Sequence, residues 1–270
     1  LLLVAVGLVV NVIAMTGVGN TLSLMIQQWA GGNLVIALTL VALASLVLGM
    51  GLPVTAAYIV LATLSAPALY NLIADAQLVE LIAAGQALPD AVGAMLMLAA
   101  PDKLGLLGHS MSTDEARGIV EALRTIDPSL VTGLYDQVLD PALLLGILLS
   151  AHMIIFWLSQ DSNVTPPVCL TAFAAAAIAG TPQIRTGFTS WKLAKGLYIM
   201  PVLFAYTPFL YGDWPAMLEI FFFTMVGLYA FAAAFQGHLE RDHGIVARLL
   251  LTAVAICLMY PGQSFLHWGG

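Results

Sequence analysis

Apolar stretches that hold at most one charged residue recur along this chain, at residues 1–15, 33–48, 54–70, 141–158, 168–179, 197–210, 216–235 and 245–259. An apolar helix of about 18 residues or more can cross a hydrocarbon layer of about 30 Å. Hydrophobic residues make up 61% of the 270 positions and charged residues only 9%, whereas an ordinary soluble domain is about a quarter charged. One soluble core cannot bury that excess, so we expect an all-α integral membrane protein.

The first segment of the chain starts inside an apolar run. That run has neither a basic leader nor a small-residue cleavage site, so we predict no cleavable signal peptide and interpret the chain as part of a longer protein. Residues 1–32 are then expected to form the end of a transmembrane helix and a connector. Cys169 and Cys257 stand alone in apolar surroundings, so neither a disulfide nor a metal site is predicted from them.

Residues 71–140 differ in kind from the rest of the chain. They hold ten acidic and three basic residues, and therefore carry the whole formal charge of −7. Pro89, Pro101 and Pro128 break their helical pattern, and Ser112 followed by Glu115 is typical of a helix start. We expect an acidic insert of short amphipathic helices in water.

A glycine and proline break interrupts the apolar stretch 33–70. Gly49, Gly51 and Pro53 separate two arms that are each short for a membrane span at about 1.5 Å per residue. A re-entrant helical hairpin is therefore expected. The glycines permit close approach, and Thr55 offers a hydroxyl ligand in the first turn of the second arm. A simple packing kink is the alternative.

A second and more polar break interrupts the apolar helix expected over residues 141–180. In lipid every backbone amide needs an internal partner, so unwound chain persists only where protein or a watery cavity surrounds it. Pro166 and Pro167 cannot donate backbone hydrogen bonds, which frees carbonyls one turn upstream. Neutral oxygens suit a hard cation or a carboxylate, and an ionisable group within the membrane is a functional candidate. Ser162, Asn163 and Thr165 provide the neutral oxygens, and Asp161 is the ionisable group.

Several polar residues have plainer interpretations. Asp161 can instead cap a helix at the water interface. His152, on an otherwise apolar helix, is interpreted as an interior histidine with a hydrogen-bond partner rather than a ligand. Trp191, Lys192 and Lys195 are typical of an interfacial anchor, because tryptophan and snorkelling lysine favour that depth.

The basic residues outside the insert predict the orientation. They fall at one membrane face if residues 181–270 form three transmembrane helices, and the positive-inside rule makes that face cytoplasmic. If residues 141–180 cross the membrane once, the insert 71–140 lies on the outer face. The five residues are Arg185, Lys192, Lys195, Arg241 and Arg248.

The two breaks together resemble a known family. Residues 49–62, which read GMGLPVTAAYIVLA, and residues 159–168, which read SQDSNVTPPV, resemble the fused membrane subunits of tripartite ATP-independent periplasmic (TRAP) transporters. The most similar subclass works with a TAXI-type solute-binding protein. Similarity also runs through residues 174–180, 185–187 and 195–208. These long runs are specific, whereas a Thr-Pro-Pro triplet alone is not.

The resemblance implies a two-repeat elevator fold, in which each repeat has a re-entrant hairpin followed by a broken helix. This chain would be the second inverted repeat, with residues 33–70 as the hairpin and residues 141–180 as the broken helix. The implied function is sodium-coupled, ATP-independent import of small organic anions across a bacterial or archaeal inner membrane. A periplasmic TAXI-type solute-binding protein would deliver the anion, and the N-terminal half of the permease would provide the remaining ligands.

The resemblance also assigns residues to the two ligands. No enzyme activity, organic cofactor or nucleic-acid partner is expected. Sodium would be held by Gly49, Gly51, Thr55, Asp161, Ser162, Asn163 and Thr165. The substrate would contact Thr55, Ser162, Asn163, Thr165 and Pro166.

Three other hypotheses stay open. Asp161 could couple transport to protons instead of sodium. An intramembrane hydrolase could use Ser159 or Ser162 with His152 and Asp161, although no separate oxyanion site or water path is evident. A binding-only receptor could use the acidic insert as its sensor.

Overall fold

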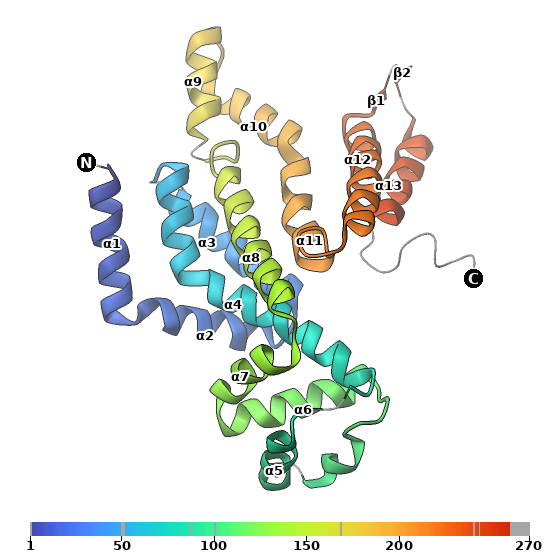
Figure 1. Ribbon diagram of the computed structural model, residues 1–270. Helices are drawn as coiled ribbons and strands as arrows, with labels where there is room; N and C mark the ends of the chain where they lie inside the picture. Colours follow the sequence, from blue (N-terminus) through green and yellow to red (C-terminus); the bar gives the residue numbers. More distant parts are fainter. Residues whose placement is uncertain are drawn as a thin grey trace. The chain divides into compact units, whose positions relative to one another are not determined.

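The computed structural model describes residues 2–49, 52–86, 88–99, 101–167, 169–239, 241–242 and 244–259 (Figure 1). The regular secondary structure of these residues is helical, apart from the paired antiparallel strands β1 (His238–Leu239) and β2 (Arg241–Asp242). The chain divides into two compact units, one of residues 1–67 and 149–270, the other of residues 68–148. The prediction of a helical chain with several apolar helices is confirmed.

The first unit contains most of the apolar helices. Its elements are α1 (Leu2–Thr16), α2 (Val18–Ala30), α3 (Leu34–Gly49), the start of α4 (Val54–Ala83), the end of α8 (Pro141–Asp161), α9 (Leu170–Ala179), α10 (Gln183–Leu193), the 3₁₀ helix η2 (Ala194–Tyr198), α11 (Ile199–Tyr206), α12 (Trp214–Gln236) and α13 (Ile245–Met259). Within the described ranges, α4, α8 and α12 are long and apolar enough to cross a membrane. Helices α1 and α2, which are bent by 70° at their junction, make a fourth if they are counted as one span.

Helix α4 continues through an internal proline. Pro67 cannot donate to the carbonyl one turn before it, so the Thr63 carbonyl loses its usual helical partner. The backbone of α2 approaches this carbonyl closely, because a Cβ at Gly19 would lie 3.0 Å from the Thr63 oxygen. Ser23 of α2 donates to the neighbouring Leu64 carbonyl at 2.9 Å. The helix therefore runs unbroken to Ala83, past residue 70, at which the predicted hairpin ends.

Helices α12 and α13 form an antiparallel hairpin (Figure 1). Their close approach depends on Gly227, since a Cβ there would lie 2.5 Å from the Met259 side chain. Arg248 of α13 donates from Nε to the Ala234 carbonyl at 2.7 Å and from its guanidinium to the Phe235 carbonyl at 3.2 Å. A cation at this position donates to carbonyls at the C-terminal end of α12 and interacts favourably with the helix dipole.

The second unit is built from short helices. It comprises the end of α4, α5 (Asp90–Ala99), the 3₁₀ helix η1 (Pro101–Leu106), α6 (Thr113–Ile126), α7 (Pro128–Val138) and the start of α8. Elements begin at Pro101 and Pro128, as the sequence predicts. The helix start at Ser112 is confirmed as a capping box, in which Ser112 and Glu115 bond each other's backbone amides. These hydrogen bonds from Ser112 hold the pKa of Glu115 below its usual range.

A partly buried polar cluster joins three helices of the second unit. The Arg124 guanidinium donates to both carboxylate oxygens of Asp75, at 2.6 and 2.5 Å. The Tyr135 hydroxyl donates to the same carboxylate at 2.7 Å. Burial, followed by the charge of Asp75, raises the pKa of Tyr135 above its ordinary value, so the phenol stays a donor. Both bonds come from Nη2 of Arg124, and the cluster ties α6 and α7 to α4, because hydrogen bonds between charged groups are stronger than those between neutral groups.

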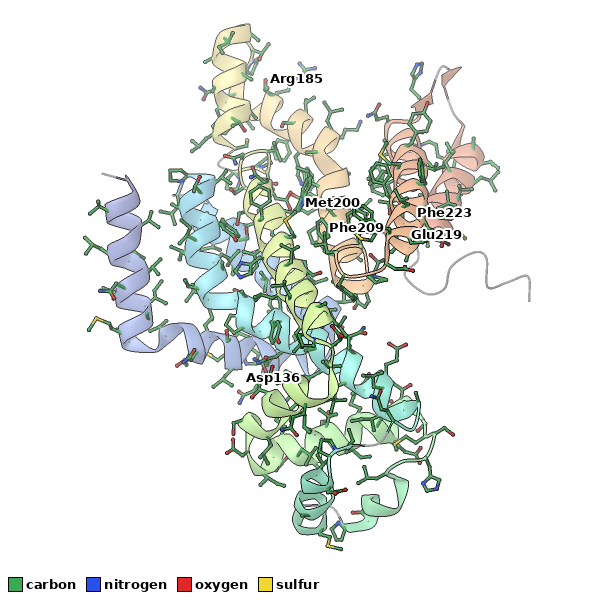
Figure 2. All side chains as sticks on the ribbon, in the orientation of Figure 1. Asp136, Arg185, Met200, Phe209, Glu219 and Phe223 are labelled. Carbon is green, nitrogen blue, oxygen red and sulfur yellow. The ribbon has the colours of Figure 1, made fainter. Side chains whose placement is uncertain are left out.

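The surface of the second unit is acidic. Of the ten acidic residues in 71–140, all except Asp75 are exposed, and Asp136 on α7 is one of them (Figure 2). Two of the three bases are engaged, Arg124 with Asp75 and Arg117 with Asp114 at 3.8 Å. This unit therefore presents a negative, hydrated surface.

Candidate functional site

Both predicted breaks interrupt helices in the structure. Helix α3 ends at Gly49 and α4 begins at Val54, whereas α8 ends at Asp161 and α9 begins at Leu170. No helix of the described chain continues through either break. Among the described residues, 52–53 and 162–167 lie outside helices, at the positions where the sequence predicts the breaks.

The two breaks lie against each other. Gly49 at the end of α3 touches Ser162, so that a Cβ at position 49 would overlap the Ser162 side chain. One turn earlier, the buried Ser45 hydroxyl donates to the Leu158 carbonyl of α8 at 2.7 Å. Residues 45 and 49 are four apart and share one helix face. Small residues on this face allow the two backbones to approach, and the approach brings the two breaks together.

Hydrogen bonds fix the backbone of the segment that follows α8. The amides of Val164 and Thr165 both donate to the Asp161 carbonyl, at 3.2 and 2.9 Å. The Ser162 hydroxyl donates to the Ser159 carbonyl at 2.9 Å. The Asn163 carbonyl, which Pro167 leaves without a helical donor, accepts from the Thr171 hydroxyl at 2.7 Å. The predicted freeing of carbonyls by the two prolines is thus met at Asn163 by a side chain.

The Asp161 carboxylate is the most unusual group in this region. Its residue is 1% exposed, and neither carboxylate oxygen has a hydrogen-bond partner among the described residues. A buried carboxylate without donors is strongly destabilising unless it is protonated or meets a cation. The alternative interpretation as a cap at the water interface does not fit, because the residue is buried and ends its helix.

Thr165 is tied to the C-terminal part of the first unit. Its hydroxyl shares a hydrogen bond of 2.6 Å with the Tyr198 hydroxyl of η2. The Trp191 indole of α10 donates to the same tyrosine at 3.2 Å. These contacts fix the orientation of the Thr165 hydroxyl relative to α10 and η2. Arg185, by contrast, is exposed near the start of α10 (Figure 2).

The remaining predicted ligands differ in their exposure. Thr55 is exposed in the first turn of α4, and Asn163 and Pro166 are half-buried in the second break. Gly51 lies outside the described residues. The structure thus brings Gly49 and Ser162 into contact next to Asp161, whereas the ligand roles of all these residues stay predictions.

His152 has a partner of its own. Its Nδ1 lies 3.1 Å from the Tyr58 hydroxyl, and the two rings pack edge to face. The interpretation as an interior histidine with a hydrogen-bond partner is confirmed. The hydroxyls of Ser159 and Ser162 each donate to a carbonyl of their own chain segment, at 2.8 and 2.9 Å. The serine–histidine pair that the hydrolase hypothesis needs is therefore not formed among the described residues.

Three residues of the region were missed by sequence reasoning. Ser45 carried a usable signal, because a polar residue one turn before Gly49 marks the same helix face. Tyr198 carried a weaker one, since it lies within a segment of family resemblance. Lys195 was interpreted as an anchor, and its place on the wall of a cavity that Thr165 also lines follows only from the folded chain.

The donor set favours a particular class of ion. Within the described ranges, no three His, Cys, Asp or Glu residues come together as transition metals or calcium usually require. One carboxylate with hydroxyl, amide and backbone oxygens is a set of hard oxygen donors, which suits a hard cation. The Asn163 side-chain amide and the Thr165 hydroxyl are groups of this arrangement that can donate to an anion.

Comparison with known proteins identifies a family. The family model described as Tripartite ATP-independent periplasmic transporter, DctM component, matches residues 1–226. No curated protein and no solved structure matches the chain. The matched region includes both breaks, the acidic unit and most of α12.

Proposed function

Because the chain belongs to the DctM family of tripartite ATP-independent periplasmic transporters, we propose that it forms the second, C-terminal repeat of a sodium-coupled permease for small organic anions. A permease of this family is a multi-pass protein of the inner membrane. In this proposal a TAXI-type solute-binding protein delivers the anion, and the N-terminal half of the permease completes the ligand sets. The contacting breaks would travel together as part of an elevator.

The burial of the Asp161 carboxylate is the observation that supports sodium coupling. It is buried, and within the described chain its oxygens have no hydrogen-bond partner. An ionisable group at membrane depth is usually functional, and a bound sodium ion would remove the energetic penalty of the unpaired charge. Gly49, Gly51 and Thr55 would complete the sodium site together with Ser162, Asn163 and Thr165.

The substrate would bind beside the ion at the second break. Hydroxyl and side-chain amide donors of the break can hold an anionic group, as broken helices do in other transporters. Thr55 and Pro166 would border this site, while Ser162, Asn163 and Thr165 would contact the anion. Sodium would then lower the energy of bringing the anion into the membrane interior, because opposite charges attract strongly in a medium of low polarity.

Sodium-driven uptake by the full-length permease in vesicles, with its binding protein outside, tests this function. We expect Asn163→Ala to lower the initial rate by about tenfold, since one ligand to a charged group is worth about 1.5–3 kcal/mol. Two variants serve as comparisons. Asn163→Asp adds a charge at the same position, and Gln160→Ala alters a neighbouring half-buried position. The measurement is uptake per inserted protein. A wild-type rate from Asn163→Ala would refute this part of the site.

The same observation also supports a second hypothesis, coupling to protons. A protonated Asp161 would also escape the penalty for a buried charge. Replacing sodium by choline at fixed pH separates the two: sodium coupling stops uptake, whereas proton coupling leaves it unchanged.

For the acidic insert we propose a position on the outer face, where it would meet a basic surface of the binding protein. Nine exposed carboxylates support this, because complementary charge mainly speeds association. Neutralising Glu121, Asp136 and Asp140 to their amides leaves the capping box and the Asp75 cluster intact. We expect the apparent KM for loaded binding protein to rise severalfold at low salt and little at high salt. An unchanged KM at low salt would remove this proposal.

A further inference from the structure

A cavity of about 760 Å³ lies within the first unit, beside the second break. Its walls come from α3, α10, η2, α11, α12, α13 and the break itself, which contributes Thr165. The volume falls in the range of about 300–1,000 Å³ that small-molecule sites usually occupy. The cavity is therefore large enough for an organic ligand that reaches the break.

Lys195 places a cation on the cavity wall. Its ammonium lies 4.3 Å from the centre of the Phe235 ring and 5.4 Å from the centre of the Trp191 ring. Among the residues that the structure describes, Lys195 has no ion-pair partner. Lys192, three residues earlier, is exposed and suits the anchor interpretation, whereas Lys195 is half-buried. Two aromatic faces attract this ammonium, but they leave its positive charge without a counter-ion.

The remaining polar groups on the wall are already engaged. Tyr198 accepts from the Trp191 indole at 3.2 Å and shares a hydrogen bond of 2.6 Å with Thr165. The rest of the lining is apolar, with Phe231, Ile256 and Met259 among it. A ligand that fits would therefore pair one negative group with Lys195 and lay an apolar body against the hydrocarbon walls.

We propose that this cavity holds the transported anion and that the substrate class is a monocarboxylate with an apolar, preferably aromatic, body. The carboxylate would pair with Lys195 and contact Thr165, the residue that the cavity shares with the substrate site proposed above, and the body would contact Phe231 and Phe235. A short dicarboxylate fits poorly, because its second charge would face apolar side chains without a partner. This inference rests on the proposed transport function, but it concerns binding and can be measured without transport.

Phenylacetate binding to the purified full-length permease, without binding protein, tests the proposal. Trp191 lines the cavity, so we expect phenylacetate to quench its fluorescence, and a Trp191→Phe protein to lack that response. Phenylacetamide, which has no charge, and succinate, which has two, should bind about tenfold more weakly or worse. Equal binding of the amide would overturn the role of the charge.

Matched lysine variants locate the charge. We expect Lys195→Ala to weaken phenylacetate binding by about tenfold or more, and Lys195→Arg to stay within about threefold of wild type. Lys192→Ala removes the same charge from an exposed position of the same segment and should change nothing. A comparable loss in Lys192→Ala would show a general surface effect and overturn the assignment. Thermal unfolding of each variant confirms that the fold is kept.

Two further arms separate the possible outcomes. Phosphatidylglycerol offers an anionic headgroup and apolar chains, so it is added alone in the same assay. A response to this lipid without any response to phenylacetate would make the cavity a lipid site and refute the substrate class. Replacing sodium by choline tests coupling separately, because phenylacetate binding that persists in choline supports this inference even where sodium-driven uptake fails.

Discussion

Replacing Gly49 with alanine is expected to lower sodium-driven uptake by the full-length permease by about ten- to a hundredfold, because overpacking costs about 1–3 kcal/mol. The new methyl group would overlap the Ser162 side chain at the contact between the two breaks. Either the breaks separate or Ser162 shifts, and both changes displace the predicted ligands. Initial uptake rates per inserted protein measure the effect.

The steric cause can be tested independently of the ligand role of Ser162. In a Ser162→Gly background the overlap disappears, so adding Gly49→Ala should cause little further loss, and a double-mutant cycle measures the coupling. Gly7→Ala is the matched control, since Gly7 is also helical and has no neighbouring atom within 4 Å of the added Cβ. Full activity in Gly49→Ala would contradict the close contact.

The positions of the breaks could be predicted because their signal is local. Glycine, proline and clustered polar residues disrupt an apolar helix wherever it folds, and in lipid such a disruption is rarely accidental. The pairing of Gly49 with Ser162 could not be predicted in the same way. It depends on how α3 and α8 cross, which is set by packing between segments more than a hundred residues apart in sequence.

The acidic unit has one feature with a local sequence signal and one without. The capping box at Ser112 follows from four consecutive residues, and the structure confirms it. The pairing of Asp75 with Arg124 joins two helices 49 positions apart and has no local signature. The same limit applies to Lys195, whose neighbours Trp191 and Phe235 come from different helices.

The continuation of α4 shows how tertiary contacts override a sequence signal. Pro67 would usually weaken or end a helix. Here α2 approaches the Thr63 carbonyl through Gly19, and Ser23 bonds the next carbonyl. The helix therefore needs partners from another segment to remain regular, and the residues that provide them lie more than 40 positions earlier.

Removing the charge of Asp161 is expected to have the largest effect on coupling. Asp161→Asn keeps the size of the side chain but cannot balance a cation, so we expect sodium-driven uptake to fall by about a hundredfold or more, as when one partner of a buried charge pair is lost at about 3–5 kcal/mol. Asp161→Glu keeps the charge and is the comparison. Uptake at several sodium concentrations measures the loss.

A stability measurement decides what the carboxylate binds, without relying on uptake. A ligand at about 100 times its Kd stabilises the folded state by about 2.7 kcal/mol. Sodium should therefore raise the Tm of the wild-type permease relative to choline at the same pH and ionic strength. Asp161→Asn should show no such rise, and its Tm in choline should exceed that of the wild type at a pH where the carboxylate is charged, because the unpaired buried charge is gone. A sodium-dependent rise that survives in Asp161→Asn would place the ion elsewhere.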